Sequence, residues 1–163
     1  MKRFIYALLI LPAIFLLTGC GEDNASNDWP DSAKQKAPSG LSEFEEVNGI
    51  GPVKAKLDIP AEFNTVKATE GEKIFDQKCY ACHRLDERLV GPPLRKVTEK
   101  RSSEFIVNMI LNPDEMQKKH PEVKKLLAEY MTQMPFQDVT MEETLLILEY
   151  LRSVADKQPT ASK

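Results

Sequence analysis

The sequence predicts an all-α fold of four to five helices. Apolar residues between about 67 and 155 recur at the three- and four-residue spacing of amphipathic helices. No stretch of this region alternates apolar and polar residues as a half-buried strand does. Helix-start signals also divide the region, because capping side chains and first-turn prolines suit the unpaired N–H groups of a helix start. We therefore expect one helical domain over residues 67–155.

The first two helices follow from capping residues. Thr69 and Glu72 form a Thr-x-x-Glu pattern, which predicts a capping box at the start of the first helix. Ser103 is expected to cap a second helix that ends at Leu111, because the following Asn-Pro113 pair disfavours continuation. Both helices carry apolar residues on one face, as core-facing helices do.

Two more helices follow towards the C-terminus. Pro121 suits the first position of a helix that runs to about Tyr130. Thr140 and Glu143 form a second capping box, which starts a leucine-rich helix that reaches Val154. About 90 residues can bury only a small core, so a large apolar ligand at the centre would supply much of the missing interior.

The five residues from Cys79 to His83 read Cys-Tyr-Ala-Cys-His, which is a covalent attachment motif for a c-type haem. Two thiols two residues apart can add across the two vinyl groups of the porphyrin. The histidine that follows is then placed under the iron as an axial ligand. The motif predicts one haem c per chain, attached through Cys79 and Cys82 and ligated by His83.

Other uses of a Cys-x-x-Cys pair fit the chain less well. A structural zinc site needs four ligands, and only Cys20 and His120 remain. A thioredoxin-like dithiol requires a βαβ context, whereas the apolar period around Cys79 is helical. A simple disulfide between the two cysteines would leave His83 without a role.

The N-terminus predicts export and lipid anchoring. Lys2 and Arg3 precede an uncharged, mostly apolar run of fourteen residues, which is typical of a signal peptide and short for a membrane span. The run ends in Leu-Thr-Gly-Cys20, which resembles the lipobox of bacterial lipoproteins. In such proteins residues 1–19 are removed and the cysteine is acylated, and two or more acyl chains anchor a protein stably. The alternative is an ordinary signal peptide with an incidental cysteine. We expect an extracytoplasmic protein on the periplasmic side of a bacterial membrane, inner or outer.

Residues 20–40 are rich in small and polar residues and predict a flexible tether. Residues 41–66 hold many apolar residues, but their glycines and prolines exclude a long helix. We expect an irregular arm there that packs on the domain and extends the haem pocket. Residues 156–163 are expected to form a disordered tail.

Charge argues against nucleic acid as a partner. The chain has a net charge of −3, and removal of residues 1–19 would shift it to −5 because Lys2 and Arg3 are lost. One segment, residues 84–101, is nevertheless basic, with six cations against three acids. These cations are Arg84, Arg88, Arg95, Lys96, Lys100 and Arg101. The segment is either a docking rim for an acidic protein or an ordinary solvated surface.

Over residues 67–155 the chain resembles class I monohaem cytochromes c of bacteria. Gly71, Phe75 and Tyr150 are similar to the family's contact between its first and last helices. The run from His83 to Gly91-Pro92 resembles the family's loop, which implies that the Pro92 carbonyl bonds the far ring nitrogen of His83. Such a bond orients a ligating imidazole and raises its basicity.

The sixth iron ligand is expected to be Met134, because Met134-Pro135 resembles the family's distal ligand and precedes Thr140 by the spacing of small members. A thioether ligand favours ferrous iron. Met131 is the main rival. His120 would give a bis-histidine haem, but its lysine and proline neighbours favour an exposed residue at a helix start. Met109 is interpreted as core filler.

The resemblance implies a membrane-anchored carrier of single electrons rather than an enzyme. The segments 105–113 and 147–152, with the insertion over residues 112–130, are also similar to cytochromes found alongside nitrous oxide reductase. We therefore expect redox proteins as partners, with nitrous oxide reductase as a candidate acceptor. The alternatives are a peroxidase-like haem enzyme or a haem-based sensor, both of which need an open sixth position.

Overall fold

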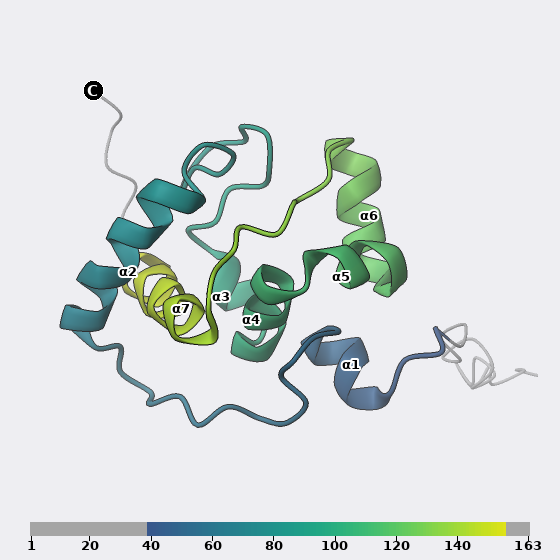
Figure 1. Cartoon of the computed structure of the whole chain (residues 1–163), viewed down its shortest axis with the longest axis horizontal. Helices are drawn as coiled ribbons and strands as arrows, with labels where there is room; N and C mark the ends of the chain where they lie inside the picture. The colour runs from purple at the N-terminus through teal and green to yellow at the C-terminus, as the bar shows by residue number, and fades with distance from the viewer. Residues whose placement is uncertain (1–38, 156–163) are drawn as a thin grey trace, which may run out of the picture. The chain divides into compact units, whose positions relative to one another are not determined.

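Helices α2 and α7 cross at the left of Figure 1 and make the most extensive helix–helix contact of the fold. The computed structural model describes residues 39–155, and within this range it contains seven helices and no strand, which confirms the predicted all-α class. The helices are α1 (Glu43–Asn48), α2 (Thr65–Lys78), α3 (Val97–Lys100), α4 (Ser103–Leu111), α5 (Pro113–Lys119), α6 (Pro121–Tyr130) and α7 (Met141–Ala155). The predicted signal peptide, Cys20, nearly all of the tether and the tail 156–163 lie outside the described residues. No helix within residues 39–155 has the length and apolar character needed to cross a bilayer.

Two of the predicted helix starts are confirmed and a third is displaced by one residue. At α7 the Glu143 N–H donates to Thr140 Oγ1 at 3.1 Å, and the Thr140 N–H donates to the Glu143 carboxylate at 2.8 Å, as a capping box requires. Helix α6 begins at Pro121. Helix α4 begins at Ser103 itself, because its capping side chain is that of Ser102.

The capping box predicted at Thr69 is wrong. Helix α2 begins five residues earlier, at Thr65, because the Asn64 side chain caps it by accepting the Lys67 N–H at 3.0 Å. Thr69 therefore lies inside the helix, and its hydroxyl donates to the Thr65 carbonyl at 3.0 Å. Three short helices, α1, α3 and α5, were not predicted. Helices α5 and α6 together form the insertion over residues 112–130.

The contact between α2 and α7 depends on a glycine. A Cβ atom added to Gly71 would lie 2.5 Å from the carbonyl carbon of Leu146, so only glycine lets the two backbones approach so closely. Phe75 and Tyr150 pack beside this crossing with ring centroids 5.2 Å apart. The core continues along α7 through Ile147 and Leu151. This packing fixes the C-terminal end of α2, which directly precedes Cys79.

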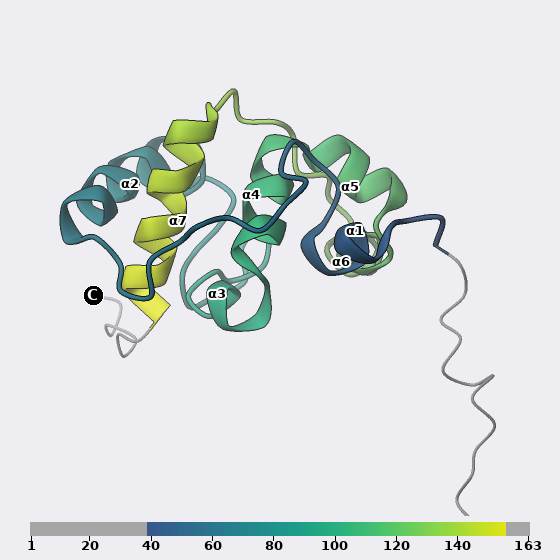
Figure 2. The ribbon, with the colours of Figure 1, turned by 90° about the horizontal axis from the view of Figure 1, so that it is seen from below.

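The arm before α2 starts with α1, which contacts α4, and then runs past α4 and α7 to the start of α2 (Figure 2). Arg152 of α7 donates to the Pro60 carbonyl at 2.5 Å. On α4, the buried Asn108 side chain accepts the Val53 N–H at 2.9 Å and donates to the carbonyls of Val53 and Asn48 at 3.1 and 3.0 Å. Side chains of the helices thus supply hydrogen bonds that the irregular arm cannot make within itself.

Candidate haem site

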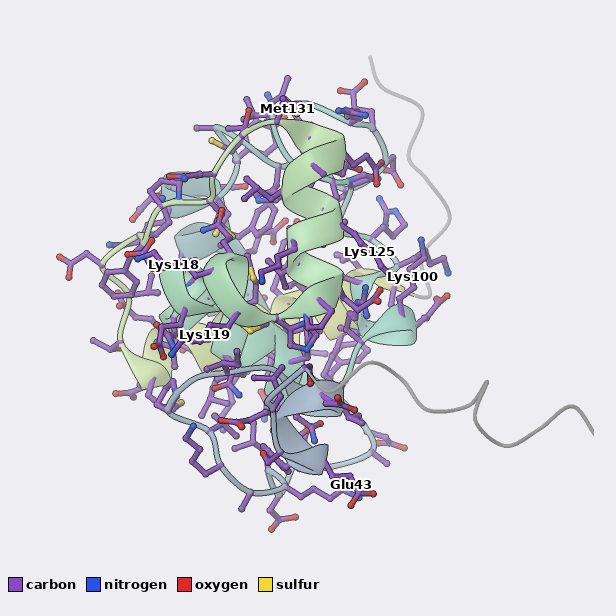
Figure 3. All side chains as sticks on the ribbon, turned by 90° about the vertical axis from the view of Figure 1, so that its right-hand side faces the viewer. Glu43, Lys100, Lys118, Lys119, Lys125 and Met131 are labelled. Atoms are coloured by element: carbon purple, nitrogen blue, oxygen red, sulfur yellow. The ribbon has the colours of Figure 1, made fainter. Side chains whose placement is uncertain are left out.

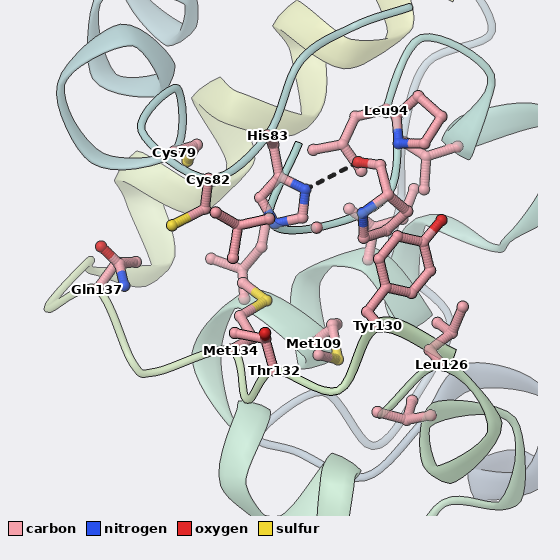
Figure 4. Close-up of a pocket in the computed structure, with 18 of the residues that line it drawn as sticks. Cys79, Cys82, His83, Leu94, Met109, Leu126, Tyr130, Thr132, Met134 and Gln137 are labelled. Atoms are coloured by element: carbon pink, nitrogen blue, oxygen red, sulfur yellow. Dashed lines mark hydrogen bonds between the residues drawn. The ribbon is translucent and has the colours of Figure 1, made fainter. Parts of the chain in front are cut away.

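The attachment motif forms a tight turn directly after α2. The backbone N–H groups of Cys82 and His83 both donate to the Cys79 carbonyl, at 3.0 and 2.9 Å. This turn brings both thiols and the imidazole to one cavity of about 490 Å³ (Figure 4). A volume of this order is within the range of small-molecule and cofactor sites. The side chains predicted to attach and ligate the haem therefore share one site.

The cavity walls are mainly apolar and come from helices α2 to α7 and from the loops between them, and Gln117 of α5 is among the lining residues. Helices α2, α4, α6 and α7 contribute Phe75, Ile106, Met109, Leu127, Ile147 and Leu151. Walls of this kind suit a large planar apolar group with two thioether links at one edge. None of the described arm residues before α2 lines the cavity, so the expectation that the arm extends the pocket is wrong.

His83 is oriented by the loop that follows it. Its Nδ1–H donates to the Pro92 carbonyl at 2.9 Å, as Figure 4 shows, which leaves Nε2 as the ring nitrogen with a free lone pair. Gly91 permits this approach, because a Cβ there would lie 2.8 Å from Nδ1 and 2.9 Å from Nε2. Burial lowers the pKa of His83, and the bond to the Pro92 carbonyl opposes that shift. The geometry favours a neutral imidazole, which is the form that ligates metals.

Cys79 does not resemble a metal-binding thiolate. Burial raises the pKa of Cys79 to about 11, so the thiol is neutral at physiological pH. Within residues 39–155 there is no group of three or more His, Cys, Asp or Glu side chains that could hold a metal ion. The residues that surround the two thiols fit thioether attachment to an apolar cofactor.

Met134 lines the cavity from the loop between α6 and α7 (Figure 4). Met131 follows α6 in the left-handed conformation at the helix end labelled in Figure 3, and 83% of its surface is exposed. It does not line the cavity. Of the two rivals for the sixth position, Met134 is therefore the one beside the site. Met109 of α4, interpreted from the sequence as core filler, also reaches the cavity wall.

His120 is buried, so the expectation of an exposed residue at this helix start is wrong. Only 1% of its surface is exposed, because α1 and Phe105 cover it. Its Nε2 lies 3.2 Å from the Glu46 carbonyl. His120 does not line the cavity, and it joins the arm to the start of α6 instead.

The basic segment 84–101 is not uniformly available to a partner. Arg95 is buried, where it pairs with both carboxylate oxygens of Asp86 and donates to the Val154 carbonyl at 2.9 Å. The predicted six-cation rim therefore loses Arg95 to the core. Arg84 and Arg88 lie over aromatic rings, 3.7 Å from the centroid of Tyr80 and 4.2 Å from that of Tyr130.

Sequence reasoning missed Gln117, whose buried side chain bonds the backbone of Met134. Gln117 belongs to α5, and its role depends on a contact across 17 residues, so no local pattern marks it.

The fold and the cavity together define a helical protein built around one covalently attached haem. The sequence profile of the family described as Cytochrome c matches residues 68–155, more than half of the chain. The chain belongs to the cytochrome c family, and it accordingly carries covalently bound haem c and transfers electrons through it.

Solved structures agree with this assignment. A cytochrome c from Rhodothermus marinus is 42% identical, with a TM-score of 0.67, and the match covers 72% of this chain and all of that one. An engineered form of the Rhodothermus marinus protein matches with a TM-score of 0.66, 42% identity and coverage of 69% of this chain and 97% of that one. A further engineered form, bound to a carbene intermediate, matches with a TM-score of 0.63 at the same identity and coverage. No curated protein sequence matched the chain.

Proposed function

We propose that this cytochrome is a membrane-anchored carrier that passes single electrons between respiratory donors and a periplasmic reductase. The observation that carries the proposal is the single cavity that Cys79, Cys82, His83 and Met134 line together. Such a set supplies two thioether links, an imidazole and a thioether ligand. The haem iron supplies the electron chemistry by alternating between the ferric and ferrous states.

The chain's own residues have three tasks in this proposal. Cys79 and Cys82 hold the cofactor at the C-terminal end of α2. His83, fixed by Pro92, presents one ring nitrogen, and Met134 offers a soft sulfur from the opposite loop. The apolar walls exclude water, so little solvent has to rearrange when the charge of the site changes. Two protein ligands that stay bound would favour electron transfer without chemistry at the iron.

A peroxidase-like enzyme or a gas sensor would need an exchangeable sixth position. Carbon monoxide binding to the ferrous protein separates these functions from electron transfer. We expect no binding at neutral pH in the native protein, together with one reversible one-electron couple in voltammetry. Rapid, complete formation of a carbon monoxide adduct would favour the enzyme or sensor instead.

We further propose that the exposed part of the basic segment docks an acidic redox partner. Arg84 and Arg88 lie on the loop that carries Val90, which lines the cavity and is 41% exposed. Complementary charges around a small apolar contact raise association rates and make them depend on ionic strength.

The docking proposal can be tested with two single charge reversals, Arg84→Glu and Arg88→Glu. We expect slower electron transfer to an acidic partner at low salt and a weaker salt dependence. Lys56→Glu is the matched control, because it makes the same charge change on an exposed residue of the arm. Equal rates and salt dependence in all three proteins would rule out this docking surface.

The proposed anchor is a lipid on Cys20, and the proposed acceptor is nitrous oxide reductase. The sequence Leu-Thr-Gly-Cys20 supports the first, and the similarity of segments 105–113 and 147–152 supports the second. A Cys20→Ala variant should move from the membrane to the soluble fraction. The reduced protein should be reoxidised when nitrous oxide and its reductase are both supplied. Reoxidation no faster than without the reductase would exclude this acceptor.

A further inference from the structure

Gln117 of α5 bonds both backbone polar groups of Met134. Its Oε1 accepts the Met134 N–H at 2.8 Å, and its Nε2 donates to the Met134 carbonyl at 2.9 Å. The same Nε2 donates to the Pro113 carbonyl at 3.0 Å. Since an amide group has two N–H donors, both are used. Only 8% of the Gln117 surface is exposed, so these bonds form away from bulk water.

The loop that carries Met134 has little other support. Within the described chain, residues 132–139 form no helix or strand and make no hydrogen bond from one backbone group to another. Lys78 holds the far end of the loop, where its Nζ donates to the carbonyls of Gln137 and Asp138 at 3.2 and 3.0 Å. Segments of this kind open locally at low free-energy cost. Gln117 thus supplies at Met134 the paired bonds that a neighbouring strand would provide.

Helix α5, which carries Gln117, is itself held in place by the arm. Its neighbour Met116 is fully buried, and the Met116 sulfur accepts the Ile50 N–H of the arm at 3.0 Å. Gly49 lies against the same side chain, because a Cβ there would be 2.6 Å from the Met116 methyl group. Helix α5 is therefore fixed by the arm at Met116 and reaches the loop at Gln117.

We propose that Gln117 is a positioning residue for the sixth ligand, which holds the Met134 loop closed over the cavity. This inference rests on the proposed role of Met134 as the iron ligand. It assigns a role to the insertion over residues 112–130, because α5 carries Gln117. The two bonds between Gln117 and the Met134 backbone form a clamp that keeps small external ligands from the iron. Loss of the clamp should leave the helices in place and let the loop open more often.

The test is the binding of imidazole to the ferric holoprotein of a Gln117→Leu variant. Imidazole can reach the iron only when the loop is open, so its apparent affinity rises with the open fraction. Each lost hydrogen bond changes such an equilibrium by about two- to tenfold. Two such bonds join Gln117 to Met134, so we expect the imidazole affinity to rise about four- to one-hundredfold. The long-wavelength band of thioether-ligated ferric haem should also fade at a lower temperature than in the native protein.

Two further variants keep the test decisive. Gln117→Glu retains the acceptor for the Met134 N–H but, when ionised, loses both donors, so it should lie between the native protein and Gln117→Leu. Gln77→Leu makes the same change on the exposed face of α2 and should leave imidazole affinity unchanged. Native affinity and a native thioether band in Gln117→Leu would overturn the clamp. A thioether band that persists in Met134→Ala would instead overturn Met134 as the ligand.

Discussion

Replacement of Asn108 by alanine should weaken the attachment of the arm to α4. The fully buried side chain accepts one hydrogen bond from Val53 and donates two, to the carbonyls of Val53 and Asn48. Each bond contributes about 0.5–1.5 kcal/mol net, and the Val53 N–H would stay buried without its partner. We expect the free energy of unfolding to fall by about 2–4 kcal/mol.

Urea denaturation of the holoprotein, followed by far-ultraviolet circular dichroism, measures this loss. Asn112→Ala is the graded control. Its Nδ2 donates one bond to the arm, to the Ile50 carbonyl at 3.2 Å, so its cost should be about 1 kcal/mol. Limited proteolysis should cut the arm faster in Asn108→Ala. If Asn108→Ala costs no more than Asn112→Ala, Asn108 is not the main attachment of the arm.

Two other perturbations test the site and its surroundings. Gly91→Ala places a methyl group against the His83 ring and should break the hydrogen bond from His83 to the Pro92 carbonyl. Loss of a hydrogen bond that orients a metal ligand weakens ligation about 10- to 100-fold, so the low-spin ferric spectrum should weaken. A native spectrum would show that the loop yields without moving the imidazole. Burial lowers the pKa of His120, so the folded state favours the neutral ring. The stability that this preference contributes is complete above the unfolded pKa of 6.5 and is lost as the pH falls through the lower folded pKa. Across about pH 5 to 7, the range in which histidine titrates, the stability of His120→Gln should therefore vary less with pH than that of the native protein. The same pH dependence of the urea midpoint in both proteins would contradict this.

The helix starts show how far local patterns determine this fold. Thr140 and Glu143 form the capping box that their spacing predicts, because the segment before Thr140 is not helical. Thr69 and Glu72 have the same spacing, but Asn64 caps the helix first, and residues 65–68 can continue it. A four-residue pattern marks a helix start only where the preceding residues do not extend the helix.

The site could be predicted where its chemistry is local in sequence. Cys79, Cys82 and His83 lie on one turn, so their spacing alone predicts that they share a cavity. The burial of His120 could not be predicted, since α1 covers it from 74 residues earlier in the sequence. The role of Gln117 likewise depends on how the insertion folds back on the Met134 loop. Tertiary contacts between distant segments decide such features.

The most direct test of the account is the long-wavelength absorption of the ferric holoprotein in the native form and in the Met134→Ala and Met131→Ala variants. A low-spin haem ligated by His83 and Met134 predicts a thioether band in the native protein and in Met131→Ala. The band should be absent from Met134→Ala, which should also gain carbon monoxide binding in the ferrous state. A native protein that lacks the band and binds carbon monoxide readily would contradict the assignment of this cytochrome as a closed-site electron carrier.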